Sequence, residues 1–173
     1  TNGVYYIWSD LRSGNYSPYV HKFNISGNAS WAANGISLST LTNTSSSSFQ
    51  CIRTNGTDIL FGWIDPINSS DVMLKCLTQS GTVVWGGATG NTYCSGPTTT
   101  DTELSTVKSS DNNLLIAIRT NPSANVDIKV QKINFNTGAE IWTPGGIFAA
   151  NTTDNELAPS IIPDNTGGCI VSV

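Results

Sequence analysis

VYYIW (residues 4–8) is the first of four apolar stretches that return at intervals of 55 residues; the others are ILFGW (59–63), LLIAI (114–118) and CIVSV (169–173). Their last residues form a column made of Trp8, Trp63, Ile118 and Val173. Self-similarity at a fixed period of tens of residues is the signature of a repeat protein. The column therefore predicts about three repeated units in this chain of 173 residues.

A second landmark is a Gly-x-x-x-Trp element, which in each unit follows a lysine and a short polar turn. The lysines are Lys22, Lys75 and Lys132, and the elements are Gly27 to Trp31, Gly81 to Trp85 and Gly138 to Trp142. A sheet with two apolar faces must be covered on both. We therefore expect the tryptophans of both columns to pack between neighbouring units, as the structural core of the repeat: Trp8, Trp31, Trp63, Trp85 and Trp142.

Apolar and polar residues alternate with period two inside each unit, as in the stretches 19–23 and 126–130. This alternation is typical of half-buried strands. Turn residues separate the runs, for example Ser-Gly-Asn at 13–15, Thr-Asn-Gly at 54–56 and Gln-Ser-Gly at 79–81. No segment shows a sustained helical period. The sequence therefore predicts an all-β fold with sequential antiparallel strands.

Each unit reads as four strands: one near SFQCI or PSIIP, one at the aromatic column, one that carries the lysine, and one after the Gly-x-x-x-Trp element. Four antiparallel strands per repeat describe a blade of a β-propeller. The predicted units are residues 1–48, which lack the first strand, 49–103, 104–157, and 158–173, which hold the first two strands of a further unit.

Residues 8–39, WSDLRSGNYSPYVHKFNISGNASWAANGISLS, resemble the propeller-type repeats of large secreted bacterial surface proteins. The shared pattern is Trp-x-Asp-x-Arg-x-Gly, an alternating strand with a basic or glutamine end, Gly-x-x-x-Trp, and a further glycine. The first unit matches it at Trp8, Asp10, Arg12, Gly14, Lys22, Gly27, Trp31 and Gly35. The third unit keeps Gln131, Lys132, Gly138 and Trp142, and its successor keeps Pro159, Ser160, Asp164, Gly167 and Gly168.

The second unit departs further from this pattern, and Arg119 stands where the family has another polar residue. The resemblance implies a secreted β-repeat scaffold and no particular activity, because a scaffold pattern does not specify a function.

The sequence starts at a second strand and finishes at the equivalent strand three units later. We expect either a segment of a longer repeat protein or a subunit that completes its sheets with strands of a neighbour. A lone copy would expose a sheet edge and apolar faces, which favours self-association. The alternative is that an irregular blade closes a compact monomer.

Composition indicates a polar surface that carries little charge, since 12% of residues are charged and the net charge is −4. Nucleic-acid binding requires a basic groove or stripe. The eight lysines and arginines are instead scattered through all units, so no nucleic-acid partner is expected. The sequence contains no transmembrane run, no cofactor motif and no signal peptide, and either a removed targeting segment or missing upstream units would explain the absence of a signal peptide.

Seven asparagines stand in glycosylation sequons, a modest excess over chance in a chain so rich in Asn, Ser and Thr. Most lie in or beside predicted turns, where a glycan fits. The candidates for N-linked glycans are Asn15, Asn24, Asn28, Asn43, Asn55, Asn68 and Asn151, of which Asn15 is weakened by Pro18.

The four cysteines, Cys51, Cys76, Cys94 and Cys169, lack the close Cys-x-x-Cys spacing of zinc and redox sites. Disulfides are the favoured interpretation, with Cys76 to Cys94 as the most plausible local pair, and buried thiols are the alternative. Disulfides and sequons together favour an extracellular, cell-surface location.

Catalytic patterns are weak. His21 is the only histidine, no Gly-x-Ser-x-Gly turn is present, and no carboxylates cluster around a histidine as in a metal site. Two copies of Thr-Asp-x-Glu-Leu place Asp101 beside Glu103 and Asp154 beside Glu156, a spacing that could serve a glycosidase or a weak calcium or sugar site. Their repetition favours a structural role in a turn.

Three functional hypotheses remain. The favoured one is a non-enzymatic structural or adhesive surface protein that builds a fibre, stalk or layer. The second is a glycan-binding module that uses aromatic side chains such as Tyr16, Tyr19 or Tyr93, although these could equally fill blade interfaces. The third is a sialidase-like glycosidase, which would need a cluster of Arg12, Arg53 and Arg119. Asp10 and Arg12 are expected to hold a hairpin by side-chain to backbone bonds and an ion pair.

Overall fold

The computed structural model describes residues 3–12, 14, 16–41, 47–53, 57–66, 70–94, 100–121 and 125–173; of residues 47 and 51–53 it describes only the backbone. Within these ranges the chain forms fourteen strands and no helix. All pairings between neighbouring strands are antiparallel. The predicted all-β fold with sequential antiparallel strands is therefore confirmed.

The first sheet contains three strands in the order β1-β2-β3. They are β1 (Gly3–Asp10), β2 (Ser17–Asn24) and β3 (Ile36–Ser37). In the β1–β2 register Trp8 lies opposite Tyr19 and Tyr5 lies opposite Lys22. Because successive side chains of a strand point to opposite faces, Tyr5 lies on one face of this sheet and Trp8 on the other.

The second sheet has the order β4-β5-β6-β7, with β8 also paired to β6. Its strands are β4 (Ser47–Arg53), β5 (Asp58–Asp65), β6 (Asp71–Thr78), β7 (Val83–Trp85) and β8 (Asn91–Tyr93). Two short strands thus share the position predicted for one fourth strand. The central strands β5 and β6 are buried almost throughout, because this sheet is covered on both faces.

The third sheet has the order β12-β11-β10-β9, and the fourth is a hairpin. Their strands are β9 (Thr100–Lys108), β10 (Leu114–Asn121), β11 (Asp127–Ile133), β12 (Ile147–Ala150), β13 (Ser160–Pro163) and β14 (Cys169–Ser172). The predicted boundaries at 48/49 and 103/104 fall inside β4 and β9, because each strand begins a few residues before its apolar centre.

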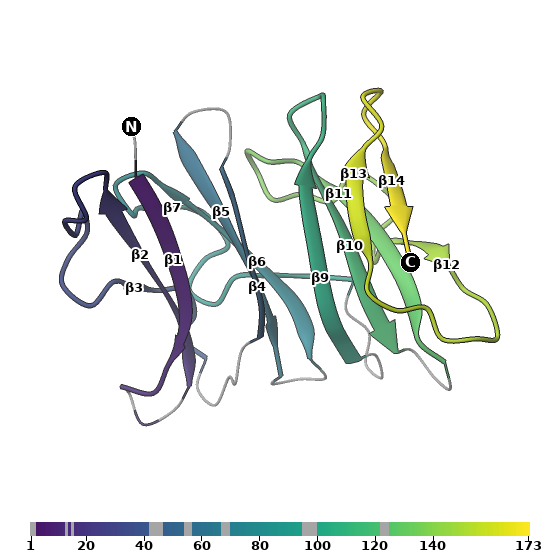
Figure 1. Cartoon of the computed structure of the whole chain (residues 1–173), viewed down its shortest axis with the longest axis horizontal. Helices are drawn as coiled ribbons and strands as arrows, with labels where there is room; N and C mark the ends of the chain where they lie inside the picture. The colour runs from purple at the N-terminus through teal and green to yellow at the C-terminus, as the bar shows by residue number, and fades with distance from the viewer. Residues whose placement is uncertain are drawn as a thin grey trace.

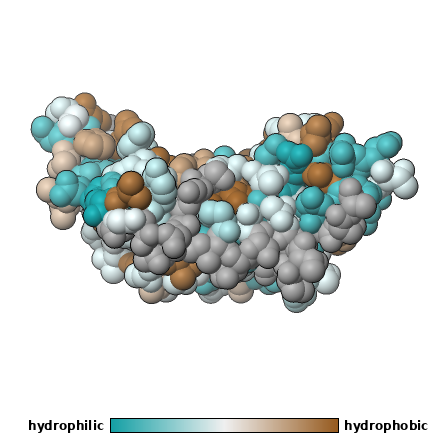
Figure 2. Space-filling view, turned by 90° about the horizontal axis from the view of Figure 1, so that it is seen from below, coloured by the Kyte–Doolittle hydropathy of each residue, from teal (hydrophilic) through white to brown (hydrophobic). Residues whose placement is uncertain are grey.

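The four sheets stand side by side in chain order, from β1–β3 at one end to β13–β14 at the other (Figure 1). Seen from below, the row is bent, so that its outline is hollowed along one long side (Figure 2). Face-to-face packing of sheets places the core between them. Three clusters of buried residues correspond to the three junctions between neighbouring sheets.

Both tryptophan columns contribute to these junctions. Trp31 and Trp63 are buried between the first and second sheets, and Trp85 is buried between the second and third. Trp142 packs, half-buried, against the core between the third and fourth sheets. Trp8 is half-buried on the outer face of the first sheet. The position of a tryptophan in the row of sheets therefore decides how much of its indole is covered.

Candidate functional site

The junctions between sheets carry repeated hydrogen bonds from tryptophan side chains. Trp31 Nε1 donates a hydrogen bond to the carbonyl oxygen of Gln79 at 3.0 Å, and Trp85 Nε1 donates one to the carbonyl oxygen of Phe135 at 2.9 Å. Both acceptors lie in the turn that follows the third strand of the next sheet. In both junctions, therefore, the tryptophan of the Gly-x-x-x-Trp element binds the equivalent turn of the next sheet.

The glycines of the second and third elements, Gly81 and Gly138, contact the tryptophan of the preceding sheet. Gly81 and Gly138 have φ values of +89° and +73°, which favour glycine. A Cβ on Gly138 would lie 2.7 Å from the Trp85 ring, and one on Gly81 would lie 2.3 Å from Ile36 Cδ1, beside Trp31. The Gly81–Trp85 element is therefore self-complementary: its glycine contacts the indole of the preceding sheet, while its tryptophan binds the following one.

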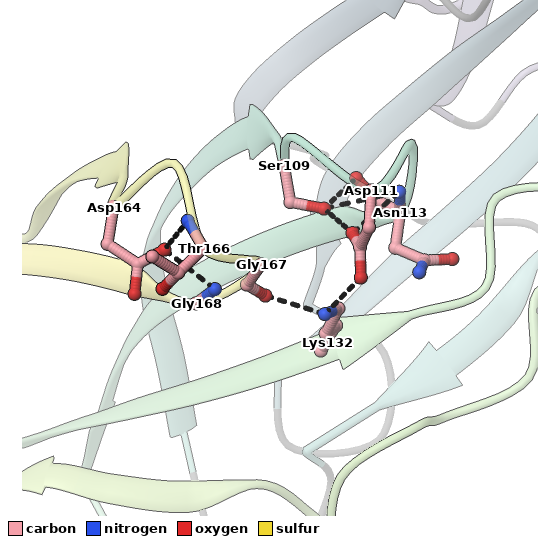
Figure 3. A network of polar contacts seen from close by, with 8 residues as sticks. All are labelled: Ser109, Asp111, Asn113, Lys132, Asp164, Thr166, Gly167 and Gly168. Atoms are coloured by element: carbon pink, nitrogen blue, oxygen red, sulfur yellow. Dashed lines mark hydrogen bonds and ion pairs between the residues drawn. The ribbon is translucent and has the colours of Figure 1, made fainter.

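Lys132 joins the third and fourth sheets through the network in Figure 3. Its Nζ lies 2.5 Å from Asp111 Oδ2 and 2.5 Å from the carbonyl oxygen of Gly167. Asp164 Oδ1 accepts hydrogen bonds from the backbone N–H groups of Thr166 and Gly168 and so shapes the turn that presents Gly167. Hydrogen bonds from Lys132 and Ser109 hold the pKa of Asp111 well below its usual range. The network fixes a turn against a strand.

The expected equivalence of the three lysines is wrong for Lys75. Tyr5, Leu60 and Leu115 are equivalent positions, spaced 55 residues apart. In the strand register Lys22 lies opposite Tyr5 and Lys132 lies opposite Leu115, but Cys76 lies opposite Leu60. Lys22 Nζ accordingly donates to the Gln79 carbonyl oxygen of the following sheet at 3.3 Å. Lys75 points the other way and donates to the Leu38 carbonyl oxygen of the preceding sheet at 2.9 Å. A shift of one residue along a strand moves a side chain to the opposite face.

A polar hollow of about 430 Å³ lies between the second and third sheets. Its lining includes Thr57 and Asp58 from the second sheet, and Asp111, Asn113 and Asn136 from turns of the third. Phe135 also lines it but is buried, so it presents little of its ring to a ligand. The hollow offers amides and carboxylates for hydrogen bonding.

The two Thr-Asp-x-Glu-Leu copies occupy different structural positions. The backbone N–H of Asp101 donates to the Ser70 carbonyl oxygen, and the equivalent bond in the next junction runs from Glu156 to Val126. Glu156, the second acidic residue of the later copy, therefore corresponds to Asp101, the first acidic residue of the earlier copy. Asp101 Oδ2 accepts the N–H of Val72 at 3.3 Å, in agreement with the structural role expected for Asp101.

The acidic residues of these copies have different surroundings. Glu103 forms an ion pair with Arg119, with 3.0 Å between Oε1 and Nη1, and Asp154 is exposed. Burial, followed by the charge of Asp71, raises the pKa of Asp101 to about 7. The pKa of Asp127 is also raised, by burial and by Glu156. Buried carboxyls therefore recur at the junctions.

His21 is buried on β2, where its Nδ1 accepts the N–H of Lys22 at 2.8 Å. Its ring stacks on Phe23, with 4.7 Å between centroids. Among the residues that the structure describes, no group of three His, Cys, Asp or Glu side chains is placed to hold a metal ion. The geometry thus places this histidine in an aromatic layer.

Asp10 and Arg12 hold the end of the first hairpin, as expected. The N–H of Arg12 donates to Asp10 Oδ1 at 2.8 Å, the guanidinium pairs with Oδ2, and Trp8 Nε1 donates to Oδ2 at 2.9 Å. The Arg12 guanidinium also covers the Tyr19 ring at 4.1 Å from its centroid. These contacts hold the pKa of Asp10 well below its usual range. Arg12 and Arg119 belong to different sheets, and the side chain of Arg53 lies outside the described residues.

Cys76, Cys94 and Cys169 are free thiols, so the predicted Cys76–Cys94 bond is not formed. Cys76 and Cys94 instead serve as small apolar side chains in the core between the second and third sheets. Burial raises the pKa of each of these two thiols to about 12, which keeps them protonated and unreactive. The side chain of Cys51 lies outside the described residues.

Three sequon asparagines, Asn24, Asn28 and Asn151, are exposed outside or at the end of strands. Asn24 Oδ1 accepts the N–H groups of Ser26 and Asn28 in the turn after β2. The other candidates lie outside the described residues: Asn15, Asn43, Asn55 and Asn68.

The tyrosines proposed as sugar platforms have different surroundings. Tyr93 is buried, and its hydroxyl donates to the Gly138 carbonyl oxygen of the third sheet. Tyr19 lies under Arg12. Tyr16 is exposed. Tyr93 therefore fills a sheet junction.

The two end sheets expose apolar faces that sequence reasoning did not resolve into residues. Val4 and Tyr6 of β1 are 66% and 58% exposed, and Ile162 and Ile170 of the last hairpin are 55% and 58% exposed. Hydrophobic residues are visible at both ends of the row in Figure 2. Large contiguous apolar patches on a protein surface often mark interaction sites.

The comparisons with known proteins return no relative: no family model, no curated protein and no solved structure matches this chain. In the described ranges no helix is long and apolar enough to span a membrane.

Proposed function

We propose that this chain is a non-enzymatic, extracellular structural or adhesive β-repeat protein that self-associates into a fibre, stalk or surface layer. The observation that carries the proposal is the self-complementary junction, in which Trp31 and Trp85 bind the glycine turns of the next sheets. A contact that is repeated from sheet to sheet can be extended by further sheets of the same kind.

In this proposal each sheet is a blade of the β-propeller type. The third sheet has four antiparallel strands in sequence order, and the chain then passes to the next sheet in the row. The bend of the row in Figure 2 supports a radial arrangement of such blades. The pattern of Trp8, Asp10 and Arg12 matches the propeller-type surface repeats described above.

A non-enzymatic role is supported by what the polar side chains contact. Lys132 joins the third and fourth sheets through Asp111 and the Gly167 carbonyl oxygen, Arg119 pairs with Glu103, and His21 lies in an aromatic layer. Each of these groups contributes to packing or to a turn. Secretion and glycosylation are supported by the exposure of Asn24, Asn28 and Asn151 and by the low charge.

Electron microscopy and light scattering of the purified protein test this proposal. We expect filaments or sheets with a regular axial repeat, in equilibrium with smaller species on dilution. Monomeric particles at every concentration would contradict self-association. Intact mass before and after removal of N-linked glycans, on protein from its source, tests the secreted glycoprotein assignment separately.

The alternative function is glycan binding, and the polar hollow between the second and third sheets favours it. Its amides and carboxylates match the hydroxyl groups of a saccharide. A glycan array followed by thermal shifts tests this alternative, because a ligand that binds the folded state raises Tm. Asn136→Ala should abolish such a shift, while Asn151→Ala, at an exposed residue that is not part of the lining, should leave it unchanged. A third possibility, a sialidase-like glycosidase, receives no support from the contacts of Arg12 and Arg119.

A further inference from the structure

We propose that the outer face of the first sheet binds the outer face of the β13–β14 hairpin of a second copy, head to tail, so that the row of sheets continues from one molecule into the next. The inference rests on the proposed self-association and names the two surfaces that carry it. We call them the β1 face, centred on Val4 and Tyr6, and the β14 face, centred on Ile162 and Ile170.

The β1 face has the same make-up as faces that are covered inside the chain. Val4 stands at the position of Ile59 in the second sheet, and Tyr6 stands at the position of Phe61, each 55 residues apart. Ile59 and Phe61 are 0% exposed because the first sheet covers them, whereas Val4 and Tyr6 are more than half exposed. The β1 face is therefore equivalent to the receiving side of a junction.

The β14 face is equivalent to the opposite side. Ile170 stands 55 residues after Leu115 and 110 after Leu60, and both leucines are 0% exposed. Leu60 packs against the third sheet, and Leu115 packs against the fourth. Ile162 lies directly opposite Ile170 in the hairpin. This cross-strand pair is therefore the apolar surface that a following sheet would cover.

The two faces match strand for strand. In each internal junction the face of one sheet that points toward the C-terminal end of the row meets the face of the next sheet that points toward the N-terminal end. Residues of the aromatic-column strands therefore lie on both sides of the core. Val4 and Tyr6 lie on β1 and Ile170 lies on β14, so each end face exposes apolar side chains of the aromatic-column strand. The described outward residues of β13 and β14 carry no charge, since Ser160 and Ser172 flank the isoleucines. Joining the faces therefore buries no unpaired charge from the hairpin.

The match is heterologous, because the two faces are different surfaces of the same molecule. Contacts of this kind form rings if the rotation closes and filaments if it does not. Pairing of two β1 faces would instead give a closed dimer and would use a contact that no internal junction shows. The second copy therefore contributes its β14 face.

Single-face variants test the arrangement. Tyr6→Lys blocks only the β1 face, and Ile170→Lys blocks only the β14 face. Each should weaken wild-type self-association by about 30-fold or more, because a lysine charge would be buried without a partner. Leu11→Lys and Leu157→Lys are matched controls, since both side chains are about half exposed and belong to neither face. Circular dichroism and Tm verify that the variants remain folded.

Mixing the two variants gives the decisive measurement. Tyr6→Lys keeps a working β14 face and Ile170→Lys keeps a working β1 face, so an equimolar mixture should form a 1:1 dimer and nothing larger by sedimentation velocity. Two monomers in the mixture would overturn the inference, as would a dimer of Ile170→Lys alone.

The failure of this inference can be told from the failure of the proposed function. Wild-type filaments that Tyr6→Lys and Ile170→Lys leave unchanged would refute the two faces while self-association stands. A wild-type protein that is monomeric at all concentrations would refute both.

Discussion

The second sheet and the first sheet contain equivalent aromatic strands, yet only the second is covered on both faces. Trp63 of β5 is 0% exposed, whereas Trp8 of β1 is half-buried and keeps its indole N–H on Asp10. Both residues end the same apolar stretch, and both face the side from which a preceding sheet would approach. The contribution of a repeated residue to stability therefore depends more on whether a neighbouring sheet covers it than on which residue it is.

The largest expected effect separates these two tryptophans. Trp63→Ala should lower the free energy of unfolding by about 3–5 kcal/mol, because it leaves a cavity in the core, and Trp8→Ala by about 1–2 kcal/mol. Urea denaturation at low protein concentration, where the β1 face is open, measures both. Equal losses would refute the comparison.

Because Asp101 is buried at the junction of the second and third sheets, we expect this junction to contribute most to the pH dependence of the free energy of unfolding. At the junction of the first and second sheets, Ser17 stands at the position of Asp71 in the register. The folded-state pKa of Asp101, about 7, lies above the ordinary value of 3.8, so the folded state holds its proton more tightly. This stabilisation is present below about pH 4 and is lost as the pH rises to 7.

Unfolding free energy should therefore fall by a few kcal/mol between pH 4 and pH 7. Besides Asp71, which opposes ionisation, Lys129 lies near Asp101 and favours it. The raised pKa values of Asp71 and Asp127 act in the same direction as that of Asp101. Asp101→Asn should remove most of the slope, and the exposed Asp154→Asn should not. An unchanged slope in Asp101→Asn would assign the effect to other carboxyls.

Glycine turns sharpen the comparison between a filled junction and an open one. Gly138→Ala and Gly27→Ala share the cost of a left-handed conformation, about 1–2 kcal/mol, since both have positive φ. Only at Gly138 does the new Cβ meet the ring of Trp85; at Gly27 it meets no atom within 4 Å. Gly138→Ala should therefore cost about 1–3 kcal/mol more than Gly27→Ala by denaturation. Gly14→Ala, also at positive φ and in open space, controls for the backbone cost.

The smallest effect concerns the indole hydrogen bond. Trp85→Phe keeps an aromatic ring but removes the bond to the Phe135 carbonyl oxygen, which should cost about 1 kcal/mol beyond the change in packing. Trp142 Nε1 donates no hydrogen bond to a described residue, so Trp142→Phe should cost only the packing change. Thermal unfolding of both variants measures the change in Tm. Equal decreases in Tm would show that the Trp85 hydrogen bond does not contribute to the stability of the junction.

Sequence periodicity was sufficient to predict the strands and their antiparallel order, because alternation with period two follows from the geometry of a single strand. It was not sufficient to place Lys75, which lies one residue from the position of Lys22 and Lys132 and so faces the other side. The Thr-Asp-x-Glu-Leu copies failed for a similar reason, since Asp101 corresponds to Glu156 and not to Asp154. Matching letters do not determine register.

The candidate site shows the same division. The glycines and tryptophans of the junction were visible in the sequence, but their pairing across sheets was not, because Trp31 and Gly81 are fifty residues apart. The polar hollow could not be predicted, since it is assembled from turns of two sheets. The sequence likewise could not show that Cys76 and Cys94 are free thiols, because this depends on how both are buried in the core between the second and third sheets.

By itself the sequence determined the all-β class, the period of 55 residues and the elements that recur in each unit, because local alternation and turn residues act within a strand and its neighbour. Only the tertiary structure decided which face each residue occupies, which indole meets which carbonyl, and which apolar faces stay open. The physical reason is that burial depends on what lies across the junction, and a side chain's partner there is some fifty residues away along the chain.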